Sequence, residues 1–425
     1  MKLESRIRTI ILSGLKLMLA GIVLILLIFG SILGMASVQL PACKISAPAS
    51  TGTALQLRDE MDLSLPGHPF GAVASPDGHW VFVAIDQVGQ GPQGIAILSR
   101  DGISTKYHRL ISLPDAPYGL TITQDGGLLL ATSGDGVAFI DVSRATTGTS
   151  DAVLGYVNDG NGAGTIEVIL SKDERFAFAT DENRGVVSVI DMGRVRTGNF
   201  SNAIVGRIPA DIAPVGMALS PDGRYLYVTS EFRKLGDSYH LLTAYVTGIG
   251  DALGLVHPAG TLTVIDAARA ESDPTKSVIA RVSAGCSPVR VALSPSGDIA
   301  WVTARRANTL EAFDTGKLLQ GSSPEMISTT AVGVAPVGVT LLEGGKIALV
   351  ANSNRFENSQ LPQTLSLIDT TAALTGKPAF YGAIRVGVFP RELYLTPDGN
   401  ILLVTNYDSN SLTAIQVSRI EEVFR

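Results

Sequence analysis

The sequence contains little cysteine, little charge and few histidines. Its 425 residues include two cysteines, Cys43 and Cys286, too few for a disulfide framework or a cysteine-based zinc site. A single bridge between them stays open, but Cys43 lies in a linker and we expect both cysteines to be unpaired. The five histidines are scattered without ligand spacing, and no Gly-x-Ser-x-Gly or Cys-x-x-Cys-His motif occurs. The sequence therefore predicts no metal site and no cofactor.

Charged residues make up only 17% of the chain, the formal net charge is −6, and no run of lysine and arginine occurs beyond the N-terminus. This balance argues against a nucleic-acid partner. Apolar residues make up 45%, and 45 glycines and 21 prolines accompany them. Such a composition is typical of a large core built from many short strands that tight turns connect.

The N-terminus has the pattern of a membrane segment. Residues 1–16 are basic, and residues 17–40 follow without a charge. A signal-peptide core has about 7–15 apolar residues, whereas about 20 span a bilayer, so the length favours an uncleaved anchor. Its basic end would lie in the cytoplasm, which places the rest of the chain in the periplasm or outside the cell. The letters LPAC, ending at Cys43, offer a second possibility, a lipidated cysteine. We assign 1–43 to this anchor or signal segment and 44–54 to a short flexible linker.

One unit repeats seven times in the remaining chain. Each copy starts at a proline or, once, a threonine, and all seven align without an internal gap. The start positions are Pro69, Pro117, Thr165, Pro214, Pro288, Pro336 and Pro390. They are separated by 48, 48, 49, 74, 48 and 54 residues. This register predicts a repeat architecture that forms a single domain despite its length.

Each copy predicts four antiparallel strands. A strand follows the start position, a Pro-Asp-Gly turn or a relative of it reverses the chain, and three more strands follow. Such a unit matches one blade of a β-propeller. The seventh copy ends after its third strand, and residues 54–69 align with the missing fourth strand. We therefore predict an all-β, seven-bladed propeller over residues 55–418, closed by its N-terminal strand. One transmembrane or signal helix would precede it, and a short tail, 419–425, would follow.

Two stretches, SPDGRYLYVTS (220–230) and TPDGNILLVTNYDSNSLTAI (396–415), resemble the YVTN-type repeat of bacterial seven-bladed propellers. The resemblance covers nearly all of the chain beyond the anchor. It implies the propeller fold and a surface or periplasmic protein of binding or unknown role. Related propellers include lactonases resembling 6-phosphogluconolactonase, and carboxymuconate cycloisomerases.

One end of the predicted propeller carries the features that point to function. The start positions and the loops between second and third strands lie at this end, here called the proline rim; the Pro-Asp-Gly turns lie at the other, the turn rim. Two insertions in the repeat, 231–260 and 353–364, both fall on the proline rim. Long loops on a rigid scaffold are a common place for function, and a lid over apolar surface is the alternative.

The residue two positions after each start is glycine in four copies, which suits a place where backbones come close. The other copies carry Glu167, Arg290 and Glu392 there, and the seventh adds Arg391 one position earlier. Such charges at a channel mouth could bind an anionic or carbonyl-bearing ligand, or form an ion pair between blades, Arg290 with Glu167 or Glu392. Together with polar residues after the second strands, the ligand-binding candidates are Glu167, Asp181, Arg305, Asn352, Glu392 and Asn406.

The resemblance also implies an enzymatic alternative. Lactonase-type propellers carry Pro-Arg-His at a start position and a glutamate after the second strand of the blade. Here Pro390-Arg391 is followed by Glu392 in place of histidine, and the matching glutamate, Glu231, stands in another blade. In such a metal-independent lactonase, Glu231 would activate water, and Arg391 or Arg290 would stabilise the oxyanion.

The aspartate that ends most third strands recurs too often to be catalytic, and we expect it to cap a turn. These residues are Asp141, Asp191, Asp266, Asp314 and Asp369.

The sequence thus favours an exported, membrane-tethered propeller that binds a small molecule or a protein at its proline rim. A lactonase-like hydrolase at the channel mouth of the same rim is the alternative, and a purely structural envelope protein is a third hypothesis.

Overall fold

A computed structural model describes residues 43, 45–49, 54–55, 57, 60–87, 91–234, 259–322, 325–355 and 363–424. The predicted anchor, 17–40, and most of the insertion 231–260 lie outside these residues. Among the described residues, no helix is long and apolar enough to cross a membrane.

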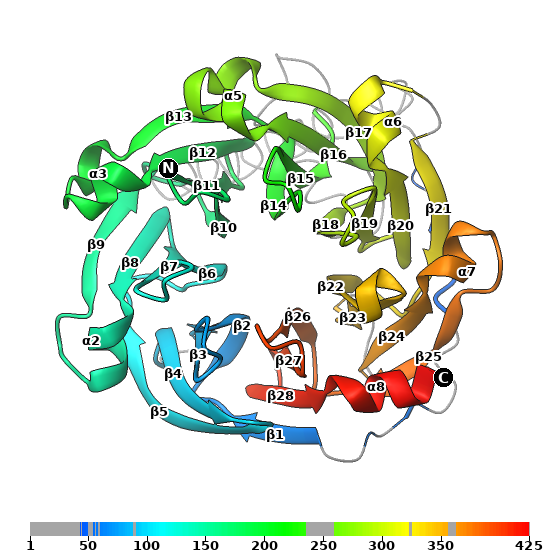
Figure 1. Ribbon diagram of the computed structural model, residues 1–425, viewed down its shortest axis with the longest axis horizontal. Helices are drawn as coiled ribbons and strands as arrows, with labels where there is room; N and C mark the ends of the chain where they lie inside the picture. The colour runs from blue at the N-terminus through cyan, green and yellow to red at the C-terminus, as the bar shows by residue number, and fades with distance from the viewer. Residues whose placement is uncertain are drawn as a thin grey trace, which may run out of the picture. The chain divides into compact units, whose positions relative to one another are not determined.

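The described strands form seven four-stranded antiparallel sheets around a central axis (Figure 1). This confirms the seven-bladed propeller. Blades one to six follow chain order, and the seventh has the order β1-β28-β27-β26.

The strands of blades one to four have the following bounds. Blade one comprises β2 (His68–Ala74), β3 (Trp80–Asp86), β4 (Gly94–Asp101) and β5 (Ser104–Ser112). Blade two comprises β6 (Leu120–Ile122), β7 (Leu128–Ser133), β8 (Gly136–Asp141) and β9 (Val153–Asn158). Blade three comprises β10 (Thr165–Leu170), β11 (Phe176–Asp181), β12 (Val186–Asp191) and β13 (Ile204–Pro209). Blade four comprises β14 (Ile212–Leu219), β15 (Tyr225–Phe232), β16 (Ala259–Asp266) and β17 (Val278–Cys286).

The remaining blades continue the pattern. Blade five comprises β18 (Pro288–Leu293), β19 (Ile299–Ala304), β20 (Thr309–Asp314) and β21 (Met326–Ala331). Blade six comprises β22 (Pro336–Leu342), β23 (Ile347–Asn352), β24 (Thr364–Asp369) and β25 (Phe380–Arg385). Blade seven comprises β26 (Pro390–Leu395), β27 (Ile401–Asn406), β28 (Ser411–Gln416) and β1 (Glu60–Ser64).

Short helices join the third strand of most blades to the fourth. They are α2 (Val142–Thr147), α3 (Met192–Arg196), α5 (Ala267–Ser272), α6 (Thr315–Gln320) and α7 (Thr370–Leu374), with 3₁₀ turns at Phe200–Asn202 and Pro274–Lys276. A further 3₁₀ turn, Glu343–Gly345, joins the first strand of blade six to the second. The recurrent aspartate is the N-cap of each α-helix, because its carboxylate accepts a hydrogen bond from the backbone three residues later. The capping role is confirmed, although the sequence did not indicate helices there.

The N-terminal strand closes the ring, as predicted. β1 pairs antiparallel with β28 from Glu60 opposite Ile415 to Ser64 opposite Ser411, and the two strands lie side by side at the blue and red ends of the colour scale in Figure 1. The chain ends in α8 (Val417–Phe424), which packs against the core of blades six and seven, so this part of the expected tail is helical.

Neighbouring blades share one core. One cluster, for example, joins Phe178 and Val187 of blade three to Leu226 and Val228 of blade four, and all four side chains are fully buried. Because both faces of each sheet are covered, the second strands are apolar almost throughout.

The two cysteines form a disulfide, which corrects the expectation that they would be unpaired. Cys43 is bonded to Cys286 at the end of blade four, with 5.4 Å between their Cα atoms. The described residues between 43 and 57, here called the N-terminal strap, also bond to the propeller: the amides of Ser46, Ala49 and Leu55 donate to backbone carbonyls of blades five and six. The described residues of the expected flexible linker are therefore attached to the scaffold.

A threonine at the same position of five blades bonds to the first strand of its own blade, of the next blade, or of both. The strand pairing of β26 with β27 shifts register after Pro390, which frees the amide of Glu392 to donate to the Thr405 hydroxyl at 3.0 Å. That hydroxyl donates in turn to the carbonyl of Phe70 in blade one at 2.7 Å. Threonines at this position elsewhere bond to the first strand of their own blade or the next: Thr132, Thr180, Thr229 and Thr303.

The glycines two positions after the start face the next blade's backbone. A Cβ on Gly216 would overlap the carbonyl oxygen of Val289, and a Cβ on Gly338 would overlap the carbonyl oxygen of Arg391. The expectation that glycine serves close backbone approach is confirmed at these positions.

Gly216→Ala should lower the free energy of unfolding by about 1–3 kcal/mol, because the added methyl forces two blades apart. Gly382→Ala is the matched control, since nothing lies within 4 Å of a Cβ built there, and it should be close to neutral. Urea unfolding monitored by circular dichroism measures both. Equal effects of the two substitutions would contradict the close-contact explanation.

Candidate functional site

The residues one position after each start lie near the beginning of the innermost strands, close to the proline rim (Figure 1). Six are apolar or aromatic and one is cationic: Phe70, Tyr118, Ile166, Val215, Val289, Val337 and Arg391. Arg391 is thus the single charge contributed by this layer.

Arg391 lies among aromatic rings. Its guanidinium carbon is 3.6 Å from the ring centroid of Phe70, 5.2 Å from that of Phe389 and 5.4 Å from that of Tyr407. No described residue accepts a hydrogen bond from it, and its buried Nε has no partner. Burial, followed by repulsion from Arg290, lowers the pKa of Arg391 to about 9. The position therefore holds a cation that lacks a matching anion.

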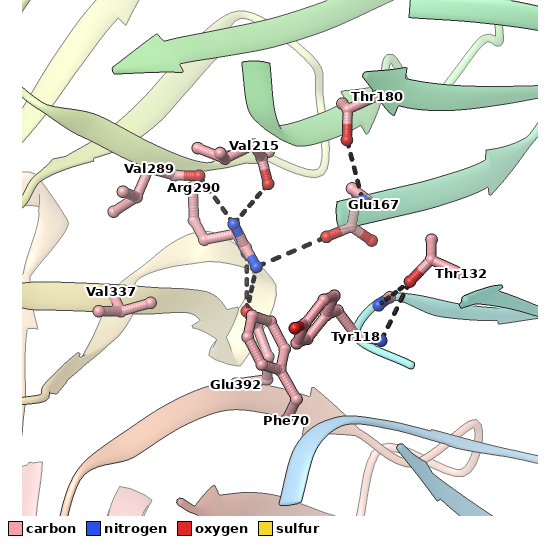
Figure 2. Close-up of polar contacts among 12 residues, drawn as sticks. Phe70, Tyr118, Thr132, Glu167, Thr180, Val215, Val289, Arg290, Val337 and Glu392 are labelled. Carbon is pink, nitrogen blue, oxygen red and sulfur yellow. Dashed lines mark hydrogen bonds and ion pairs between the residues drawn. The ribbon is translucent and has the colours of Figure 1, made fainter. Parts of the chain in front are cut away.

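One layer deeper, Arg290 bridges two carboxylates from other blades (Figure 2). Its Nη2 lies 2.6 Å from Glu392 Oε1 and 3.7 Å from Glu167 Oε2. Its Nη1 donates to the carbonyls of Val215 and Val289 at 2.6 and 3.1 Å. The Arg290 side chain is only 10% exposed. The structure therefore shows the ion pair between blades that the sequence offered as an alternative to ligand binding.

Glu167 is the weakly held member of this triad. Its side chain is 17% exposed, and no hydrogen bond to its carboxylate occurs among the described residues. Burial, opposed by Arg290, raises its pKa to about 7. Glu167, Arg290 and Glu392 line a cavity of about 150 Å³ together with Phe70 and Tyr118.

Nearer the proline rim, Glu231 is also paired. Its Oε2 accepts from Arg305 Nη2 at 2.5 Å and from the Ser287 hydroxyl at 2.9 Å, and all three residues are buried. No hydrogen bond or ion pair joins Glu231, Arg290 and Arg391 to one another: Glu231 is paired with Arg305 and Arg290 with Glu392. A catalytic role for these three residues stays a prediction.

Glu182 and Arg355 complete the charges near Arg391. No side-chain hydrogen bond or ion pair holds either residue within the described part of the chain. The pKa of Glu182 is raised to about 7, by burial first and then by Glu231, whereas Arg305, Arg355 and Arg391 oppose the shift. Partial burial and then Arg305 lower the pKa of Arg355. Two cations and one carboxylate without direct partners therefore interact at the channel mouth.

Backbone strain is concentrated at the same rim. The residue before the start proline has a positive φ in blades four to seven: Ala213 (56°), Ser287 (53°), Ala335 (51°) and Phe389 (56°). This left-handed region is unfavourable for a bulky side chain, and the strain persists where the surrounding structure imposes it. It aims the Phe389 ring at Arg391 and the Ser287 hydroxyl at Glu231.

Three other candidates bond within their own blades. Asp181 accepts from the backbone of Arg184, and burial raises its pKa to about 6. Asn352 donates to Thr364 and Ser366. Asn406 similarly donates to Ser411 and Thr413. In the repeat, each of these three residues comes one position before the one that Glu182 and Glu231 occupy in their own copies. Successive side chains of a strand point to opposite faces, so the three residues point away from the side on which Glu182 and Glu231 lie. No hydrogen bond or ion pair joins Asp181, Asn352 or Asn406 to Arg391 in the described part of the chain. Ligand binding by these three residues stays a prediction.

Several residues that surround Arg391 are not among the sites that the sequence predicts. These are Phe70, Tyr118, Glu182, Arg355, Phe389 and Tyr407. Aligning the copies one position after the start would have revealed Phe70 and Tyr118, whereas Arg355 lies in one of the two insertions, where most copies offer no residue for comparison.

Neither a family model nor a curated protein matches the sequence. The chain is similar in structure to a chain of hydrazine synthase from Kuenenia stuttgartiensis, with a TM-score of 0.60, 17% identity and coverage of 87% of this chain and 99% of that one. It is also similar to a chain of a mitotic checkpoint complex, with a TM-score of 0.59, 15% identity and coverage of 89% and 97%. At these identities the likeness shows the propeller fold alone, and membership of the YVTN family stays a prediction.

Proposed function

We propose that this chain is an exported, membrane-tethered binding module of the YVTN type, with its ligand at the channel mouth of the proline rim. The observation that supports this proposal is that Arg391 has no hydrogen-bond acceptor among the described residues. A half-buried guanidinium without an acceptor is costly, and a bound ligand that supplied an acceptor would remove that cost.

Export and tethering have separate support. Residues 17–40 are long enough and apolar enough to anchor the chain. The Cys43–Cys286 disulfide fits an oxidising compartment, and it engages the sulfur that a lipid-modified cysteine would need. Both observations favour an uncleaved anchor over a lipoprotein.

A thermal-shift screen of the full chain in detergent, against a broad set of small metabolites, tests the binding function. At least one compound should raise the melting temperature of the wild type and not that of Arg391→Gln. Arg385→Gln is the matched control, because Arg385 is exposed on the outer strand of blade six and should respond like the wild type. A screen in which every active compound shifts all three proteins equally would place binding elsewhere.

A lactonase-like hydrolase is the second candidate, and Glu182 favours it. A carboxyl group with a pKa of about 7 beside unpaired Arg391 combines a general base with a group that stabilises an oxyanion. Glu231 is less suited to be the base because Arg305 and Ser287 hold its carboxylate. Turnover of sugar or carboxylated lactones that persists with chelator and is lost in Glu182→Gln would support the enzyme; no turnover by the wild type would eliminate it.

A further inference from the structure

The surroundings of Arg391 point to the chemical class of the ligand. We propose that the channel mouth binds a small monocarboxylate with a planar apolar body, its carboxylate on Arg391 and its body against the rings of Phe389 and Tyr407. This inference rests on the proposed binding function and specifies the ligand.

A carboxylate fits the donors that Arg391 leaves open. A guanidinium is planar and offers paired N–H groups that match the two oxygens of a carboxylate. Arg290 and Arg305 also lie close enough to influence the pKa of Arg391, but their charges are already matched by Glu392 and Glu231. Arg355 adds a second cation beside the site.

The neighbouring charges limit the ligand to one negative charge. Glu182 interacts with both Arg391 and Arg355, and Asp86 accepts a hydrogen bond from the Tyr407 hydroxyl at 2.6 Å. A dianion such as phosphate would gain from the two arginines but would be repelled by these two carboxylates. A monocarboxylate places its single charge at Arg391 alone.

The rings determine the preference for a planar apolar body. His68 holds Tyr407 in place. The two rings stack with 4.4 Å between their centroids, and His68 Nδ1 lies 2.6 Å from the Tyr407 carbonyl oxygen. The Phe389 and Tyr407 rings are 5.3 Å apart and tilted by 57°, and both are partly exposed. Rigid, half-exposed rings beside a cation suit a flat ligand that stacks on them while its carboxylate meets the guanidinium.

The experiment uses ¹⁹F NMR of 4-fluorobenzoate with the full chain in detergent micelles, and empty micelles are measured in parallel. The wild type should broaden the fluorine signal, and neutral 4-fluorobenzamide should bind at least about tenfold more weakly, because it lacks the charge. Inorganic phosphate at equal concentration should not displace 4-fluorobenzoate.

Two pairs of variants assign the contacts. Arg391→Gln should weaken 4-fluorobenzoate binding at least about tenfold, and Arg385→Gln should leave it unchanged. Phe389→Gly should weaken binding by about 3–10-fold although it relieves backbone strain, and a melting temperature measured on the same sample separates this loss from unfolding. Ala335→Gly introduces glycine at the matching positive-φ position of blade six, and it should have no effect on binding.

Equal binding of 4-fluorobenzoate and 4-fluorobenzamide, displacement by phosphate, or no binding to the wild type would overturn the monocarboxylate. None of these results would overturn the binding module itself, because the metabolite screen tests that proposal without assuming a ligand class.

Discussion

Arg290→Met should lower the free energy of unfolding by about 3–5 kcal/mol at neutral pH, a very large effect for one side chain. The substitution leaves Glu167 and Glu392, which are mostly buried near the axis, without their shared cation. It also removes the donor that satisfies the carbonyls of Val215 and Val289. Urea unfolding of the full chain in detergent measures the loss.

The loss in Arg290→Met should depend on pH. The pKa of Glu167 is about 7 in the folded protein, above the ordinary glutamate value of 4.5, so the folded state holds this proton more tightly than the unfolded state does. Its contribution to stability is fully present below about 4.5 and is lost as the pH rises through about 7. Because Arg290 opposes this shift, its removal should raise the pKa of Glu167 further. Arg290→Met should therefore be less destabilising at pH 5 than at pH 8.

Two further variants distinguish the loss of the Arg290 ion pairs from the general effect of removing an arginine. Arg175→Met removes an exposed ion-paired arginine, and it should change the stability far less than Arg290→Met does, because solvent screens the pair. Combining Glu167→Gln, Arg290→Met and Glu392→Gln should recover much of the stability, since the buried charges are then absent. An Arg290→Met protein as stable as Arg175→Met at every pH would show that the triad does not stabilise the propeller.

The disulfide is the second large contribution. Replacing Cys43 and Cys286 with serine should lower the free energy of unfolding by about 2–5 kcal/mol, because the bond links residues 243 positions apart and so restricts the unfolded chain. Unfolding of the double variant and of the reduced wild type should agree.

The reducing agent itself needs a control. It should lower the melting temperature of the wild type and leave that of the double serine variant unchanged. Thiol titration of the unfolded, unreduced wild type should find no free cysteine; two free thiols would contradict the bridge.

The sequence by itself determined the fold because each blade is encoded locally and repeated. The turn at Pro221-Asp222-Gly223 is fixed within a few residues: Ser220 donates to the Asp222 carboxylate at 2.6 Å, and Asp222 accepts from the amide of Arg224. The cap at Asp314 spans three residues. Seven copies in register, the last lacking one strand, were therefore enough to predict the propeller and its closure.

Tertiary structure alone decided which side chains meet at the channel mouth. The sequence singled out Arg290 and Arg391, which differ from the residues at matching positions, but not that Glu392 and Glu167 neutralise the first and that the second has no acceptor among the described residues. Cys43 likewise meets Cys286 only because the N-terminal strap passes along blades five and six. Such contacts join residues that are far apart in the chain, and their geometry depends on the closure of the whole ring. Local patterns encode each blade, whereas the ring that the blades form together sets the chemistry at its axis.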